Sequence, residues 1–113
     1  MRRGEVWWAE LEPRSGSEQR GRRPVVVVSH DGFNEVPSWR SVVAVPLWTT
    51  RARTGPTAIA LTPGSGGLGK ECVAPCHQVT TLDRTKLTKR VGALAPADLA
   101  RLAEGLRAAL DLG

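Results

Sequence analysis

Four consecutive valines, residues 25–28, follow Pro24 and constrain the fold of this chain more than any other feature. β-Branched residues favour extended backbone, and a continuous apolar run of this length is typical of a strand buried on both faces. The sequence therefore predicts a central strand over residues 24–29. Pro24 also pushes the residue before it toward extended backbone, so the chain itself is expected to aim the guanidinium of Arg23 at the junction of loop and strand.

Short apolar segments alternate with polar connections along the rest of the chain. Further strands are predicted at 4–11, 41–47, 57–61, 71–79 and 89–94, turns at 30–40 and 63–69, polar loops at 13–22 and 48–56, and a single helical turn within 81–87. A long helix is predicted to begin at Pro96, because the residues after it form one apolar stripe: Leu99, Leu102, Ala103, Leu106 and Leu110. Many short strands and one terminal helix predict a mostly β (α+β) fold, a small antiparallel β-barrel with a C-terminal helix packed on it.

Length and charge narrow the range of functions. A chain of 113 residues forms one domain, residues 1–113, and a domain this small favours a dimer. The formal charge of +5 favours a polyanionic partner such as nucleic acid. The first apolar run after the N-terminus is interrupted by Glu10 and Glu12, so neither a signal peptide nor a membrane span is expected, and the protein is expected to be cytoplasmic.

The two cysteines do not suit a disulfide or a metal site. Cys72 and Cys76 lie four positions apart on a predicted strand, about 13 Å at a rise of about 3.3 Å per residue, whereas a disulfide needs roughly 4.4–6.8 Å between Cα atoms. They are interpreted as reduced core cysteines. His77 follows Cys76, but successive strand residues face opposite ways and no second ligand cluster is present. No metal and no cofactor is expected.

Two polar loops carry the residues suited to chemistry on a phosphate. The first contains Glu18, Arg20, Arg22 and Arg23, in which an arginine can stabilise a developing negative charge and a glutamate can take a proton. The second begins at Trp48 and continues with two hydroxyls and two arginines: Thr49, Thr50, Arg51 and Arg53. Each loop taken alone also suits a solvated connection with weak surface ion pairs.

The histidines and tryptophans leave further alternatives open. His30 and His77 could form an acid–base pair, but nothing in the sequence brings them together, and structural or surface roles are favoured. Trp39 and Trp48 flank loops, where they could stack on bases or lie in a protein interface.

Five short motifs occur in a recognisable order. Residues 3–7 read R-G-E-V-W, residues 16–19 read G-S-E-Q, residues 22–29 read R-R-P-V-V-V-V-S, residues 45–47 read V-P-L, and residues 77–83 read H-Q-V-T-T-L-D. Together they resemble the MazF/PemK/Kid toxin family, the endoribonuclease half of bacterial type II toxin–antitoxin pairs. The resemblance runs along nearly the whole chain.

The resemblance implies an SH3-like barrel, a homodimer, a cognate acidic antitoxin, and sequence-specific, metal-independent cleavage of single-stranded RNA such as mRNA. In such enzymes the 2′-hydroxyl of the RNA attacks the adjacent phosphorus and leaves a 2′,3′-cyclic phosphate and a 5′-hydroxyl. Two other classes stay open: a catalytically weak module of the same fold that binds nucleic acid or antitoxin, and a toxin directed at DNA gyrase. Glu18 and Arg23 argue against the gyrase toxin.

The resemblance also implies roles for individual residues. Arg23 matches the catalytic arginine of the family and Glu18 matches the acid of its S-E-Q loop. Strict counting puts Trp48 where the family has a Thr or Ser, and a shift of one residue makes Thr49 the third catalytic group. The expected RNA-binding residues are Arg20, Arg22, Trp48, Thr50, Arg51, Arg53 and Gln78.

Overall fold

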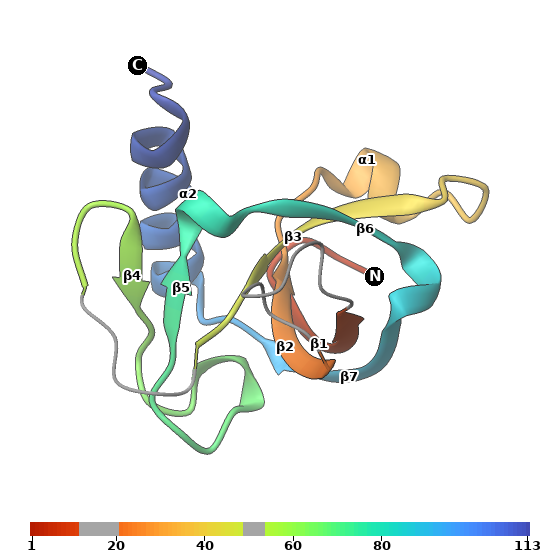
Figure 1. The fold of residues 1–113 in the computed structure, drawn as a ribbon, viewed down its shortest axis with the longest axis horizontal. Helices are drawn as coiled ribbons and strands as arrows, with labels where there is room; N and C mark the ends of the chain where they lie inside the picture. Colours follow the sequence, from red (N-terminus) through yellow and green to blue (C-terminus); the bar gives the residue numbers. More distant parts are fainter. Residues whose placement is uncertain (12–20, 49–53) are drawn as a thin grey trace.

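The structure is a computed structural model that describes residues 1–11, 21–48 and 54–113. In these ranges a five-stranded antiparallel sheet comprises β1 (Glu5–Leu11), β2 (Gly21–Val27), β3 (Ser41–Pro46), β6 (Thr80–Asp83) and β7 (Leu87–Ala93). A two-stranded sheet comprises β4 (Ala58–Ala60) and β5 (Val73–Pro75). The helices are α1 (Asp31–Asn34) and α2 (Pro96–Leu110), with 3₁₀ turns η1 (Ser65–Gly67), η2 (Cys76–Gln78) and η3 (Arg84–Lys86). Figure 1 shows α2 beside the small sheet, on one side of the curved large sheet.

The large sheet curls into an open barrel. Its strand order is β6-β3-β2-β1-β7, so in the described part of the chain β6 and β7 are its edges and remain unpaired with each other. The prediction of a mostly β, antiparallel fold with one C-terminal helix is confirmed, and SH3-like barrel describes the curled sheet loosely. None of the helices in the described ranges is long and apolar enough to cross a membrane.

The valine run occupies the middle of this sheet, as predicted, and both of its faces are covered. Val26 packs with Val6 and Leu47 into a core that α2 and the small sheet close. Val25 and Val27 face the other way, into a second core inside the curled sheet. Two cores on opposite faces explain why a strand without polar alternation is stable here.

The central strand begins earlier than predicted, at Gly21, and ends earlier, at Val27 rather than Ser29. Residues 21 and 22 were expected in a loop, but β1 extends far enough to pair with them, with Leu11 opposite Gly21 and Ala9 opposite Arg23. Backbone hydrogen bonding to β1 therefore holds Arg23 in an extended strand.

The prediction of one strand over 71–79 is wrong. β5 ends at Pro75, and the chain then turns through η2 before β6 begins at Thr80. The turn is fixed by two backbone bonds, from Cys76 N–H to the Thr57 carbonyl (2.7 Å) and from Val79 N–H to the Cys76 carbonyl (3.2 Å). Both cysteines are buried and free, in agreement with the sequence analysis.

Two other short elements differ from the predictions. The helical turn expected in 81–87 is confined to η3, whose N-cap Asp83 accepts from Thr85 N–H at 2.9 Å, and most of the segment belongs to β6 and β7. The predicted turn region 30–40 contains the four-residue helix α1, which His30 caps by accepting from Gly32 N–H at 2.8 Å.

The C-terminal helix begins at Pro96, as predicted. Near its start the buried carboxylate of Asp98 accepts hydrogen bonds from the Thr62 N–H and hydroxyl and from Arg101, each at 3.0 Å. Gly105 brings the helix against η2 and β4, because a Cβ there would lie 2.7 Å from the Cys76 sulfur and 2.8 Å from Ile59 Cγ1. The helix thus fixes the 3₁₀ turn that carries His77 and Gln78.

Candidate active site

Arg23 is an exposed residue on a fixed strand. Its neighbour Pro24 is buried, and the Pro24 carbonyl accepts from Leu47 N–H at 2.9 Å, which joins β2 to the end of β3. The exposed side chain of Arg23 is therefore directly adjacent to the buried core. An arginine placed in this way can meet an anion without rearrangement of its backbone.

Trp48 directly follows the end of the β2–β3 pairing. That pairing runs from Val27 with Ala44 to Val25 with Pro46, and the bond from Leu47 N–H to the Pro24 carbonyl continues it. Trp48 then exchanges two backbone hydrogen bonds with Val73 of β5, both 2.9 Å. An indole therefore stands at the position where strict counting of the family motif expects a Thr or Ser.

Arg22 and Arg23 do not converge. Successive strand residues point to opposite faces of the sheet, and Arg22 lies over the ring of Trp8, with its guanidinium carbon 4.6 Å from the ring centroid. A cation–π contact at an exposed site contributes about 0.5–1 kcal/mol. Arg22 therefore places a second positive charge close to Arg23 in the chain but on the other face of the sheet.

His77 and Gln78 lie on the other side of Trp48. The His77 ring meets the Trp48 indole edge-on, with centroids 6.1 Å apart at 76°. The Gln78 side-chain nitrogen is 3.4 Å from His77 Nε2, and both side chains are exposed. Sequence reasoning selected Gln78 but passed over His77, because the segment was read as one strand. The signal for His77 was its place directly before Gln78, and the 3₁₀ turn is what brings it to Trp48.

Six other predicted site residues fall in the ranges 12–20 and 49–53, which lie outside the described residues. They are Glu18, Arg20, Thr49, Thr50, Arg51 and Arg53. His30 caps α1 and His77 lies on η2, with separate contacts, so the structure does not form the acid–base pair.

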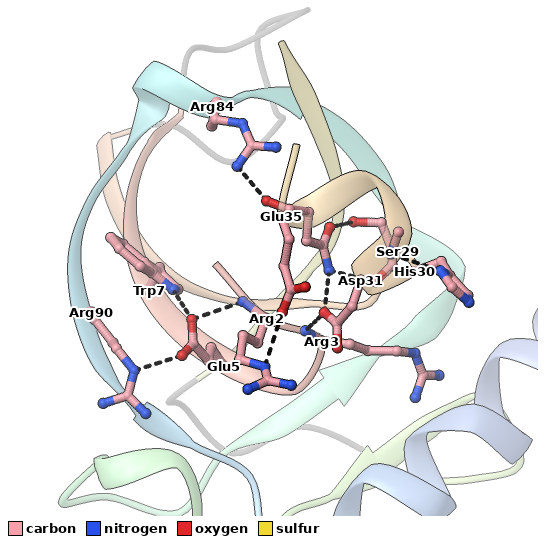
Figure 2. Close-up of polar contacts among 12 residues, drawn as sticks. Arg2, Arg3, Glu5, Trp7, Ser29, His30, Asp31, Glu35, Arg84 and Arg90 are labelled. Carbon is pink, nitrogen blue, oxygen red and sulfur yellow. Dashed lines mark hydrogen bonds and ion pairs between the residues drawn. The ribbon is translucent and has the colours of Figure 1, made fainter. Parts of the chain in front are cut away.

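A second polar cluster surrounds Glu5 (Figure 2). The carboxylate accepts hydrogen bonds from Arg2 N–H (3.0 Å), the Trp7 indole (3.1 Å) and Arg90 (2.9 Å). Burial raises the pKa of Glu5, but the hydrogen bonds from Trp7, Arg2 and Arg90 outweigh it and leave the pKa below its usual value. Glu5 stays ionised at neutral pH and joins the N-terminus to β7, which is a structural role.

Arg84, also drawn in Figure 2, has a structural role as well. Its guanidinium donates to the carbonyls of Phe33, Asn34, Val36 and Trp39, at 2.7–3.2 Å. These bonds satisfy carbonyls at the end of α1 and in the connection to β3. In the part of the chain that the structure describes, no three His, Cys, Asp or Glu side chains are grouped so that they could hold a metal ion.

Comparisons with known proteins identify similar chains of the same length. The family model for the PemK-like, MazF-like toxin of type II toxin–antitoxin systems matches residues 2–110. The chain is 36% identical to endoribonuclease MazF9 of Mycobacterium tuberculosis (99% of this chain, 98% of the relative). It is 30% identical to endoribonuclease EndoA of Bacillus subtilis (99% and 96%).

Solved structures agree in fold. One, described as an endoribonuclease in complex with its cognate antitoxin from a mycobacterial species, superposes with a TM-score of 0.81 at 32% identity, covering 100% of this chain and 97% of the other. MazF from Deinococcus radiodurans superposes with a TM-score of 0.79 at 26% identity, covering 99% and 97%.

Proposed function

This chain belongs to the PemK-like, MazF-like toxins of type II toxin–antitoxin systems, and from that premise we propose that it cuts single-stranded RNA, including mRNA, at specific sequences without a metal ion. It is an endoribonuclease toxin, the activity by which relatives 30–36% identical over nearly its whole length are named. In the proposed reaction the ribose 2′-oxygen attacks the adjacent phosphorus and the bond to the 5′-oxygen breaks. The products are a 2′,3′-cyclic phosphate and a 5′-hydroxyl.

The position of Arg23 is the observation that carries this proposal. Its exposed guanidinium lies next to the buried part of β2, which β1 and β3 hold on both sides. Arginine stays protonated, so its role is to stabilise the negative charge that develops on the phosphate oxygens. Glu18 is proposed to take or relay a proton, and Thr49 to donate a hydrogen bond to the same phosphate.

The RNA is proposed to bind through basic, aromatic and polar side chains around these groups. Backbone phosphates suit the arginines, and unpaired bases suit an indole or an amide. The proposed RNA-binding residues are Arg20, Arg22, Trp48, Thr50, Arg51, Arg53 and Gln78.

One observation favours a second candidate function. Trp48, which directly follows Leu47 at the end of β3, has no hydroxyl to offer a phosphate. If Thr49 does not supply that hydroxyl, the protein is a catalytically weak module that binds RNA or antitoxin with the same surface.

Incubation with a long RNA in EDTA, with mapping of the cut ends, separates the two functions. We expect cuts at a short recurring sequence, with a cyclic phosphate on one side and a 5′-hydroxyl on the other. Intact RNA that is nevertheless retained in a gel-shift assay would identify the binding module instead.

The proposed partners follow from the family and from charge. A cognate antitoxin is proposed, as in the mycobacterial complex, and it is proposed to be acidic because this chain carries a formal charge of +5. The working form is proposed to be a homodimer in the cytoplasm.

A further inference from the structure

We propose that His77 takes the proton of the attacking 2′-hydroxyl in this active site, which leaves Glu18 the role of relaying a proton. The inference rests on the proposed RNA cleavage and adds to it a residue that sequence reasoning set aside. It is carried by the contact of His77 with Trp48, at the point where β3 ends beside the strand that carries Arg23.

The described part of the site lacks a proton acceptor without His77. Arg23 is a donor and cannot take a proton, the Trp48 indole is a donor only, and the Gln78 amide does not titrate. Histidine, in contrast, ordinarily exchanges a proton between pH 5 and 8. A base within reach of the attacking hydroxyl is what internal cyclisation requires besides charge stabilisation.

Trp48 links His77 to the part of β2 that carries Arg23. Its ring contacts His77 with centroids 6.1 Å apart. The residue before Trp48, Leu47, donates from its N–H to the carbonyl of Pro24, which directly follows Arg23. In the proposed pose the ribose lies near the imidazole and its 3′-phosphate near the guanidinium.

The backbone beneath His77 is fixed although its side chain is exposed. The preceding residue, Cys76, is fully buried, and its N–H donates to the Thr57 carbonyl at 2.7 Å. The absence of a side chain at Gly105 lets α2 pack directly on the Cys76 sulfur. A fixed backbone positions the His77 side chain, so little conformational entropy of the backbone is lost at each turnover.

The Gln78 side chain adjoins the ring of His77, with its nitrogen 3.4 Å from His77 Nε2. On the inner side of the turn, the Leu102 carbonyl of α2 accepts from the Cys76 thiol, and Ile59 of β4 lies beside the Gly105 position.

The proton balance of the step is complete. Neutral His77 takes the 2′-hydroxyl proton as the 2′-oxygen bonds to phosphorus, and Arg23 stabilises the phosphorane. The bond from phosphorus to the 5′-oxygen then breaks, and that oxygen takes a proton from solvent water. His77 releases its proton to solvent after the products leave.

The test uses the full-length protein in EDTA and an oligonucleotide carrying the mapped cut site, with a single ribose at that site. We expect His77→Gln to lower kcat by about 100-fold or more, the usual contribution of a positioned base. We expect the acidic limb of the wild-type pH–rate profile to vanish in this variant. Added imidazole should restore turnover to His77→Ala in a saturable manner.

The matched control is the other histidine of the chain. His30→Asn keeps a side chain able to cap α1 and should leave both kcat and the pH profile unchanged. A His77→Gln enzyme with kcat within threefold of wild type, or with only KM raised, would overturn the role of His77 and leave the proposed function intact. A wild-type protein that does not cut RNA at all would instead contradict the proposed function.

Discussion

The side chain of Arg23 is exposed, whereas its backbone is held in place, because the next residue, Pro24, is buried and its carbonyl accepts a hydrogen bond from Leu47 at the end of β3. We expect Arg23→Ala to slow RNA cleavage about 100- to 1000-fold, the usual effect of removing one preorganised donor. The circular dichroism spectrum should stay unchanged, because the side chain is exposed. Initial rates on the mapped substrate measure the effect.

The adjacent arginine provides the control for Arg23. Arg22→Ala removes the same charge from the opposite face of the sheet, where it rests on Trp8. It should weaken RNA binding and leave kcat close to wild type. Equal losses of kcat in the two variants would contradict a special role for Arg23.

The hydroxyl next to Trp48 is tested by two neighbouring substitutions. Thr49→Ala should reduce cleavage more than Thr50→Ala, because Thr49 is one residue from the position where the family motif has its hydroxyl. Single-turnover rates of the two variants on the same oligonucleotide decide the order. If Thr50→Ala is the more damaging, the alignment of this loop must move by one residue; if neither matters, the binding-module function gains.

Asp98 makes stability depend on pH. Burial raises its pKa, but hydrogen bonds from Ser65, Thr62 and Arg101 outweigh it, so the pKa lies below the usual Asp value. A lowered folded-state pKa gives stability that is present above the unfolded-state value of about 4 and lost as pH falls through the folded-state pKa. The free energy of unfolding in urea should therefore decline below about pH 4.

Replacing Asp98 tests this contribution. Asp98→Ala leaves Thr62 N–H without its acceptor and should lower the free energy of unfolding at pH 7 by about 1–3 kcal/mol. The difference between wild type and variant should shrink as pH is lowered. A difference independent of pH would mean that the carboxylate charge adds nothing.

Among the elements, α2 packs closely against η2 and β4 because residue 105 is a glycine. Alanine in a helix interior is ordinarily favoured over glycine by about 1 kcal/mol. At position 105, however, a Cβ would overlap Cys76 and Ile59, so Gly105→Ala should destabilise the protein by about 1–3 kcal/mol. Ala100→Gly, on the exposed face of the same helix, is the comparison that reports propensity alone. A stabilised Gly105→Ala variant would show that the packing relaxes.

Elements with a strong local signal could be predicted from the sequence. The valine run and the Pro96 helix carry their own periodicity and punctuation, and both lie where the sequence predicts. The start of β2 was missed because pairing with β1 continues to Gly21, a tertiary effect that local propensity does not contain. The break at Pro75 was missed because the 3₁₀ turn depends on a bond to Thr57, far along the chain.

The residues of the candidate site show the same difference between local sequence signals and tertiary contacts. The extended backbone of Arg23 could be predicted, because Pro24 acts on it through the chain. The approach of His77 to Trp48 could not, since it depends on how β5, η2 and α2 pack together. Residues joined only by tertiary contacts leave no spacing rule in the sequence.

At the scale of the whole molecule, surface and charge predict assembly. Large apolar side chains are exposed at Phe33, Val36, Trp39, Leu110 and Leu112, and the formal charge is +5. We expect a homodimer by light scattering at micromolar concentration, because burying such surface between copies stabilises a small domain. A monomer at that concentration would contradict this expectation.

The same charge predicts competition between substrate and antitoxin. An acidic, partly disordered antitoxin segment should bind across the RNA surface, attracted by the field that attracts RNA. Saturating RNA with 2′-deoxyribose at the cut site, which cannot be cleaved, should displace the antitoxin in a fluorescence assay. Antitoxin binding unaffected by this RNA would place the two sites apart.

Trp48 joins the large sheet to the small one through its backbone alone, by two hydrogen bonds to Val73. Those bonds form with almost any side chain at position 48. Mutation can therefore exchange the side chain at position 48 while the joint between the sheets survives. Because Trp48 is proposed to bind RNA, we expect substitutions there to change the RNA contact without unfolding the scaffold.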